Sequence, residues 1–176
     1  MGQAGAPGDG RGSLAYNFTY DRRRVCGTEP LGDELVHEHT KANLIAILVV
    51  WLHESRDGQV FASSPFILDD YNCLAPDIGV LTGERLKRGI DNLFRGAPHL
   101  AVEVVSRETA RRLRAKIGLY LKYGSKAVWV VYPDQRLIEV HWVSDQVTIL
   151  GQDQILKGHD ALPGFSTPVR KIFAGL

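Results

Sequence analysis

Cysteine is scarce in this chain. Its 176 residues include two cysteines, Cys26 and Cys73. They lie far apart along the sequence and lack the close spacing of the cysteine ligands in a metal site. A disulfide-rich scaffold and a cysteine-based metal site are therefore excluded, and we expect both thiols to be reduced.

Long hydrophobic runs and an excess of one charge sign are absent as well. The strongly apolar stretch from Leu44 to Leu52 is too short to span a bilayer. The Gly-, Ala- and Pro-rich start, Met1 to Gly12, lacks the apolar core of a signal peptide. The formal net charge is +1, so any nucleic-acid surface has to be a local patch. We expect a soluble, cytoplasmic protein with no membrane contact.

Apolar residues are abundant enough for one core, at 44% of the chain. The length fits one domain, or one domain with an extension. The segment from Leu14 to Val25 carries aromatic residues and an arginine cluster that suit either an arm or an edge strand. We predict a flexible N-terminal extension over residues 1–24 and a folded domain over residues 25–176.

Periodicity predicts most elements of this domain. A long helix is expected from Asp33 to about Arg56, and it is apolar nearly all round, as in a helix sandwiched in a core or at a subunit contact. Further expected elements are short strands at 59–63, 66–68 and 77–81, a long polar loop at 82–99, and a hairpin formed by strands 137–142 and 146–150.

The clearest local unit spans residues 100–132. It consists of a strand at 100–105, a helix at 107–123 that ends at Gly124, and a second apolar strand at 127–132. A strand, a helix and a strand in this order imply a right-handed crossover between parallel strands. Ser106 is the expected cap of the helix.

Two carboxylates fall on neighbouring predicted strands. Glu103 lies in the middle of an apolar strand, where an ionised group is costly unless it is paired or bound to a metal; a structural ion pair with an arginine explains it equally well. Asp77 follows Pro76 and opens the next strand, where an ordinary turn aspartate is the alternative. Side by side, the two acids would repel unless a cation lay between them, and their oxygens suit a hard divalent ion.

The helix at 107–123 brings positive charge to these acids. Lys116 lies at the border of its apolar face and can point toward Glu103, where it would orient a water or stabilise charge on a phosphate; the alternative is a surface lysine. Arginines on this helix form the best local basic patch and suit phosphate contacts, although such a face is often only solvated. They are Arg107, Arg111, Arg112 and Arg114.

Three polar residues lie together near the start of the long helix: His37, Glu38 and His39. The two histidines are two positions apart, so they do not share a helical face and are a poor metal-binding pair. We expect solvent exposure, or a supporting role in which Glu38 or His39 reaches the acid site.

Taken in order, these residues resemble a known family over roughly residues 30 to 176. The matching positions are Pro76–Asp77, Ala97 to Ser106 with Glu103, Lys116, Tyr120, Gly124, Trp129 to Val131, Pro133, and Leu162 to Phe165. The chain resembles the Uma-type restriction-endonuclease family of the PD-(D/E)XK nuclease superfamily.

The resemblance implies an α/β, restriction-endonuclease-like fold: a mixed central β-sheet flanked by helices, with a C-terminal β-hairpin. It also implies hydrolysis of phosphodiester bonds in DNA with Mg²⁺ or Mn²⁺ as the cofactor. Asp77, Glu103 and the main-chain carbonyl of Val104 would be the metal ligands. Lys116, from the following helix, would be the third catalytic residue.

Two positions depart from the family pattern. Arg107 stands where a proline usually follows the serine, and Arg112 stands where an aspartate usually precedes the helix lysine by four residues. Arg112 places an extra cation near the site, which would either assist phosphate binding or mark a weakened site.

Three functions remain open from the sequence. The first is a metal-dependent DNA endonuclease. The second is a non-catalytic nucleic-acid-binding or oligomerisation module that retains the fold, which Arg112 and the near-neutral charge favour. The third is a phosphodiesterase for small molecules, or an RNase, that uses the same metal. The apolar long helix and the aromatic N-terminal segment predict a homodimer.

Overall fold

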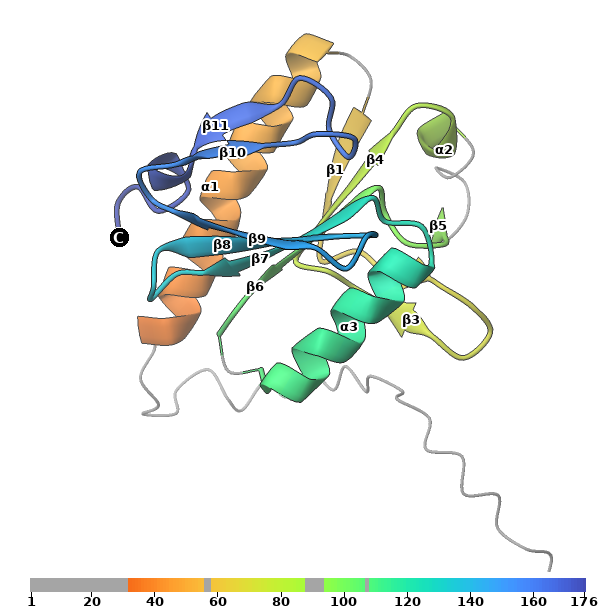
Figure 1. The fold of residues 1–176 in the computed structure, drawn as a ribbon. Coiled ribbons are helices and arrows are strands. Elements are labelled where there is room, and N and C mark those ends of the chain that lie inside the picture. The colour runs from red at the N-terminus through yellow and green to blue at the C-terminus, as the bar shows by residue number, and fades with distance from the viewer. Residues whose placement is uncertain (1–31, 56–57, 88–93, 107) are drawn as a thin grey trace, which may run out of the picture.

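The computed structural model describes residues 32–55, 58–87, 94–106 and 108–176. A six-stranded mixed sheet forms the centre, with strand order β1-β4-β6-β7-β8-β9 (Figure 1). The strands are β1 (Gly58–Ala62), β4 (Ile78–Thr82), β6 (Leu100–Val104), β7 (Ala127–Tyr132), β8 (Leu137–Trp142) and β9 (Val147–Gly151). The predicted N-terminal extension, residues 1–24, lies outside the described residues.

Two helices cover opposite faces of the sheet: α1 (Gly32–Ser55) and α3 (Ala110–Lys122). Alternate residues of β6 point to opposite faces, so Val102 packs in the core beneath α1 while Ala101 packs beneath α3. The predicted mixed sheet flanked by helices is confirmed. No helix within the described ranges combines the length and apolar character needed to cross a membrane.

The predicted strand–helix–strand unit is present as β6, α3 and β7. β6 and β7 pair in parallel, from Leu100 opposite Ala127 to Val104 opposite Val131. Leu113, Ile117 and Tyr120 form the buried stripe of α3. The helix begins later than predicted, because the side chain of Thr109, and not that of Ser106, accepts the capping hydrogen bond from the Arg112 N–H.

Helix α1 buries only one face. Leu44, Leu48 and Leu52 follow a four-residue spacing and are at most 4% exposed, whereas Val49 and Val50 are 47% and 61% exposed. The expectation of a helix sandwiched in the core is therefore wrong. One stripe packs on the sheet and the opposite side faces solvent.

The long polar loop predicted at 82–99 is wrong in part. It contains α2 (Glu84–Lys87) and β5 (Phe94–Arg95), and residues 88–93 lie outside the described ranges. β5 pairs in parallel with β2 (Phe66–Ile67), which also pairs with β3 (Cys73–Leu74). Phe94 is held there by ring contacts with Phe61 and Phe66.

The C-terminal part continues beyond the predicted β8–β9 hairpin, which is confirmed. β10 (Ile155–Lys157) and β11 (Ser166–Pro168) form a second antiparallel pair, followed by the 3₁₀ helix η2 (Val169–Lys171). Leu156 and Phe165 bury their side chains in the core beneath α1, so this pair covers the same face of the sheet as α1 (Figure 1).

Candidate active site

Asp77 and Glu103 lie opposite each other at one end of the sheet. β4 and β6 are antiparallel, with Ile78 opposite Val102. Asp77 precedes Ile78 and Glu103 follows Val102, so the same register places the two acids across from each other. The main-chain N–H of Val104 donates to Oδ2 of Asp77 at 2.8 Å. This bond fixes the Asp77 carboxylate against the end of β6.

Asp77 is kept ionised by two donors. Nε2 of His37, from α1, lies 3.3 Å from Oδ2 of Asp77. Burial would raise the pKa of the Asp77 carboxyl, but the hydrogen bonds from His37 and from the Val104 N–H outweigh it and hold that pKa below its usual value. The bond to Asp77 in turn raises the pKa of His37, against the effect of its burial.

Glu103 is buried, at 4% exposure. Lys116 Nζ donates to its Oε2 at 2.9 Å, and the Tyr120 hydroxyl donates to its Oε1 at 2.7 Å. Burial raises the pKa of Glu103 to about 6, even though Lys116 and Tyr120 favour the ionised form. The two acids of the site thus have pKa values displaced in opposite directions, which is characteristic of functional carboxylate pairs.

Lys116 lies between two carboxylates. Its Nζ donates to Oε2 of Glu103 and, at 3.1 Å, to Oε2 of Glu108. Burial would lower the pKa of Lys116, but Glu103 and Glu108 outweigh it and the pKa is raised. Lys116 is therefore a fixed positive charge directly beside Glu103, as its place at the border of the apolar face of α3 predicted.

The carbonyl of Val104 faces the same region. The Val105 N–H donates to the Val131 carbonyl, so alternate residues of β6 make the hydrogen bonds to β7. Val104 is the intervening residue, and its N–H points away from β7 to Asp77. Within a strand the N–H and C=O of one residue point the same way, so the Val104 carbonyl also lies on the Asp77 side.

These donors fit the divalent ion that the resemblance implies. Asp77, Glu103 and the Val104 carbonyl offer oxygen ligands, the type that Mg²⁺ and Mn²⁺ prefer. Among the described residues, no three His, Cys, Asp or Glu side chains gather as a metal cluster by themselves. Mg²⁺ is commonly held by one or two carboxylates, with waters and substrate phosphates completing its shell, so two carboxylates are sufficient.

The two residues predicted to support the site, Glu38 and His39, differ in whether their side chains reach it. Nε2 of His39 donates to the Ala174 carbonyl at 2.8 Å, so the His39 side chain is directed to the C-terminal segment and not to Asp77. Glu38 reaches the site indirectly, since its Oε1 lies 3.1 Å from Nδ1 of His37 and 2.9 Å from Nζ of Lys41. Of the two alternatives, solvent exposure or a supporting role, His37 takes the second: its side chain is 16% exposed and lies 3.3 Å from Asp77.

Four contributors to the site were not among the predicted site residues. They are His37, Lys41, Glu108 and Tyr120. Tyr120 is four residues after Lys116, a spacing that shares a helical face and signals a common partner. His37 and Lys41 have the same spacing on α1, and the charge of Lys41 also lowers the pKa of Asp77.

The predicted basic patch is only partly described. Arg111 and Arg114 are exposed on α3, whereas Arg107 lies outside the described residues. Arg112 Nε lies 3.5 Å from Oε1 of Glu108, and the Arg112 side chain is 52% exposed. Two exposed arginines therefore remain as candidate phosphate contacts beside a third that is engaged with Glu108.

The family model for Uma2, described as "Putative restriction endonuclease", matches residues 27–170. The chain belongs to this family. Among solved structures it is similar to a crystal structure of a putative nuclease belonging to DUF820 from Anabaena variabilis ATCC 29413, with a TM-score of 0.71 and 17% identity over 78% of this chain and 80% of that one. No curated protein matches the chain. The family supports a nuclease-like function, and the structural likeness supports the fold.

Glu108 contacts both Arg112 and Lys116. The resemblance implies an aspartate four residues before the helix lysine, where this chain has Arg112. Here Glu108 supplies a carboxylate to Lys116 from eight residues before it, and Arg112 pairs with that same carboxylate. A carboxylate is therefore retained beside Lys116, and the charge of Arg112 is partly balanced.

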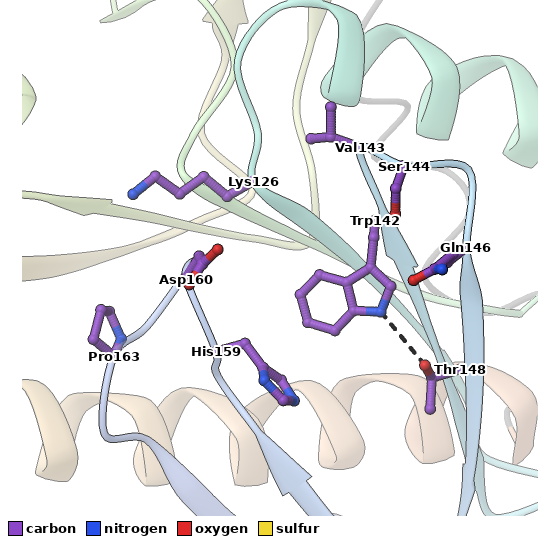
Figure 2. Close-up of a pocket in the computed structure, with 9 residues that line it drawn as sticks. All are labelled: Lys126, Trp142, Val143, Ser144, Gln146, Thr148, His159, Asp160 and Pro163. Atoms are coloured by element: carbon purple, nitrogen blue, oxygen red, sulfur yellow. Dashed lines mark hydrogen bonds between the residues drawn. The ribbon is translucent and has the colours of Figure 1, made fainter.

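A separate hollow lies at the other end of the sheet. It has a volume of about 840 Å³, and Figure 2 shows its lining side chains, which include Lys126, Trp142 and His159. Lys126 directly precedes Ala127, which pairs with Leu100 at the start of β6. The acid pair is at the opposite end of β6, so this hollow is not part of the candidate active site.

Proposed function

We propose that the protein is a metal-dependent endonuclease that hydrolyses phosphodiester bonds of DNA. The observation that carries the proposal is the convergence of Asp77, Glu103 and Lys116 at one end of β6, with the acids in direct register and Lys116 bonded to Glu103. Membership in the Uma2 family supports the same chemistry.

In this proposal the acids and the Val104 carbonyl hold a divalent cation, Mg²⁺ or Mn²⁺. A cation bound there would lower the pKa of a water molecule and stabilise charge on the scissile phosphate. The Val104 N–H and His37 keep Asp77 ionised and fixed in place, so that it is ready to bind the cation without reorganising.

Lys116 is the proposed group that orients water and offsets charge on the phosphate. The hydrogen bond from Lys116 to Glu108 keeps the Lys116 ammonium paired in this proposal. When Glu103 directs an oxygen to a cation, Glu108 still gives the Lys116 ammonium a counter-charge. Tyr120 holds the other oxygen of Glu103 and limits how the carboxylate can turn.

DNA would approach over the exposed face of α3. Arg111 and Arg114 are the described arginines placed to meet a phosphate backbone, and such contacts are weakened by salt. We expect the Arg111→Ala, Arg114→Ala double variant to bind duplex DNA more weakly than wild type, with a shallower salt dependence of the binding constant.

The test is cleavage of supercoiled plasmid in Mg²⁺ or Mn²⁺ by wild type and by Asp77→Ala, Glu103→Ala and Lys116→Ala. Asp153→Ala and Lys157→Ala are matched controls, because both residues are exposed and both follow β9, which is three strands from β6 in the order of the sheet. We expect metal-dependent nicking by wild type and both controls, and a loss of at least 100-fold in the three site variants. Equal nicking by all six proteins would identify a contaminating nuclease.

One observation favours the alternative of a non-catalytic nucleic-acid-binding or oligomerisation module. The charges of the site are balanced internally: Lys116 by Glu103 and Glu108, and Asp77 by His37. This alternative predicts DNA binding or self-association that survives Asp77→Ala, together with no cleavage by wild type and no heat of Mn²⁺ binding in calorimetry.

Substrate class is decided by the same assay. Single-stranded DNA, RNA and a chromogenic phosphodiester are run beside the plasmid. Cleavage of RNA or the small phosphodiester without cleavage of duplex DNA would replace DNA as the substrate but keep the metal chemistry.

A homodimer is also part of the proposal. The buried stripe of α1 is directed to the core of its own chain, so the contact between copies would use a different surface from this stripe.

A further inference from the structure

Strand β9 is the last strand of the central sheet and pairs with β8 on one side only. Exposed edge strands are usually protected against further pairing by a charged residue, a proline or a bulge. β9 reads Val-Thr-Ile-Leu-Gly from Val147 to Gly151 and has no charged residue and no proline. Its pairing with β8 runs without interruption over all five residues. Among the described residues, no strand pairs with the outer side of β9, so this edge is open to another strand.

The register with β8 shows which groups of β9 point outward. The Trp142 N–H donates to the Gln146 carbonyl, so the directly bonded positions on β9 are Gln146, Thr148 and Leu150. The positions between them, Val147, Ile149 and Gly151, direct their N–H and C=O groups away from β8.

The hydrogen bonds of Gly151 agree with this alternation of inward and outward main-chain groups. Its N–H donates to the Gln154 side chain at 2.8 Å, and its carbonyl accepts from the Gln154 N–H at 3.0 Å. Within the described part of the chain, no hydrogen bond occupies the outward groups of Val147 and Ile149. Two donors and two acceptors thus line the open edge.

Exposed apolar side chains occur on β9 and on the segments that flank it in the sequence. Among the described residues, eight large hydrophobic side chains are exposed, and four of them lie between positions 143 and 155. These are Val143 (64%), Val147 (50%), Ile149 (60%) and Ile155 (45%). Val147 and Ile149 alternate along β9 and so share one face of this strand, and exposed apolar side chains on an unpaired edge strand are typical of a contact surface.

We propose that β9 pairs with β9 of a second copy of this chain, in antiparallel orientation about a two-fold axis at Thr148. In this register Val147 lies opposite the partner's Ile149, and each such pair exchanges two main-chain hydrogen bonds. All four outward groups of each strand are then bonded, and the two sheets become one continuous sheet. A strand edge with this symmetric pattern is complementary to itself, as a two-fold contact requires.

Charged residues of the two copies come near one another at the ends of the edge in this arrangement. Asp145, in the β8–β9 turn, falls opposite the partner's Gly151, one residue from the partner's Gln152. The Arg170 N–H is bonded to the Gln152 carbonyl, so exposed Arg170 lies at that end of the edge. That end carries exposed Arg170 and exposed Asp153, one charge of each sign, so Asp145 meets no net charge there and the pairing rests on the main-chain hydrogen bonds.

The arrangement also fixes how the two candidate active sites are related. A two-fold axis between antiparallel edge strands is perpendicular to the sheet, so both α3 helices lie on one face. The two β6 strands then point in opposite directions, and the two acid pairs lie at opposite ends of the joined sheet. Pairing through β9 does not depend on catalysis, so it can be tested separately.

Light scattering coupled to size-exclusion chromatography tests the surface. Wild type is expected at twice the mass of the chain. Ile149→Lys and Val147→Lys place a charge on the contact and should give the monomer mass. Val50→Lys is the matched control, because Val50 is equally exposed but lies on α1, and it should remain dimeric.

Ile149→Pro tests the main-chain pairing itself. It removes an outward N–H and none of the β8–β9 bonds, so the fold is retained while the dimer is lost. Thermal melting monitored by circular dichroism verifies folding of each variant. A wild type that is monomeric at millimolar concentration would overturn the proposal, as would a dimer disrupted by Val50→Lys and not by Ile149→Lys.

A cross-link tests the register. Opposing residues at a non-hydrogen-bonded antiparallel position have Cα atoms about 4.5 Å apart, within the range of a disulfide. Thr148→Cys, in a background of Cys26→Ser and Cys73→Ser, should form a covalent dimer under mild oxidation. Val50→Cys in the same background should not. Failure of Thr148→Cys to cross-link a dimeric protein would overturn the register.

Discussion

At the scale of single residues, the buried surroundings of Glu103 disfavour its charged form. This should make the free energy of unfolding depend on pH. Burial raises the pKa of Glu103 to about 6 from an ordinary value of 4.5. The folded state therefore holds the Glu103 proton to a higher pH than the unfolded state does. The free energy of unfolding should fall as the pH rises from about 4.5 to about 6.

Glu103→Gln removes this titration and keeps an acceptor for the Tyr120 hydroxyl. We expect wild type to lose on the order of 1 kcal/mol more stability than Glu103→Gln between pH 5 and pH 7. Urea unfolding of both proteins at the two pH values measures the difference. Identical pH responses would show that the environment of Glu103 does not disfavour its charge.

The His37–Asp77 pair makes a second prediction. The pKa of Asp77 is lowered, so its contribution to stability is present above its ordinary value and is lost as the pH falls through the folded-state pKa. The pKa of His37 is raised, so its contribution is present below its ordinary value of 6.5 and is lost as the pH rises through the folded-state pKa.

His37→Ala should therefore destabilise most at mildly acidic pH, by roughly 1 kcal/mol, and least at pH 9. Urea unfolding at pH 5.5 and pH 9 measures it, with His53→Ala as the control because His53 is exposed on the same helix. A loss that is the same at both pH values would mean that His37 acts through packing and not through its charge.

Some of these side-chain contacts can be predicted from the sequence and others cannot. Glu103 and Lys116 belong to one strand–helix unit, so local periodicity was sufficient to predict that they face each other. The contact of His37 with Asp77 joins α1 to the start of β4, and no local pattern reports a contact between such distant segments. Glu108 was missed because it lies before the first turn of α3, where helical spacing does not apply.

At the scale of elements, the glycines give a matched pair of predictions. Gly118 is in the interior of α3, and a Cβ added there would contact nothing within 4 Å. Gly118→Ala should stabilise the protein by about 0.5–1 kcal/mol, because alanine loses less backbone entropy in a helix. Gly158 follows β10, and a Cβ there would lie 2.2 Å from the Leu162 carbonyl oxygen.

Gly158→Ala should destabilise by about 1–3 kcal/mol, because main-chain atoms would have to move. Thermal unfolding of both variants beside wild type measures the two effects. A neutral Gly158→Ala would show that the turn between β10 and β11 yields easily, and a destabilising Gly118→Ala would show that the exposed face of α3 is packed against another surface.

Elements with long periodic patterns were predicted well, and short ones were not. The parallel strands β6 and β7 and the hairpin β8–β9 each have five or six residues and were placed almost to the residue. β2 also lay within a predicted strand. β3, β5, β10 and β11 have two or three residues each, too few to display an alternating pattern, and their pairing depends on segments far away in the chain. The exposed side of α1 was misjudged because Val49 and Val50 are apolar although they face solvent.

At the scale of the whole molecule, the fold separates two surfaces. The acid pair lies where β4 and β6 meet, between α1 and α3, whereas the open edge β9 is three strands away from β6 in the order of the sheet. Substitutions at Ile149 are therefore expected to change the oligomeric state without altering the contacts of Glu103, and substitutions at Glu103 are expected to leave the dimer intact.

If Asp77, Glu103 and Lys116 form a metal-dependent nuclease site, the conservative substitution Glu103→Gln should abolish the activity. This variant keeps the size of the side chain and changes only its charge and one oxygen. Plasmid nicking in Mn²⁺ is measured beside Mn²⁺ binding by calorimetry, on wild type and on the variant at equal concentration. We expect wild type to bind Mn²⁺ and nick the plasmid, and we expect Glu103→Gln, still folded, to do neither. Nicking by Glu103→Gln at the rate of wild type would contradict this expectation.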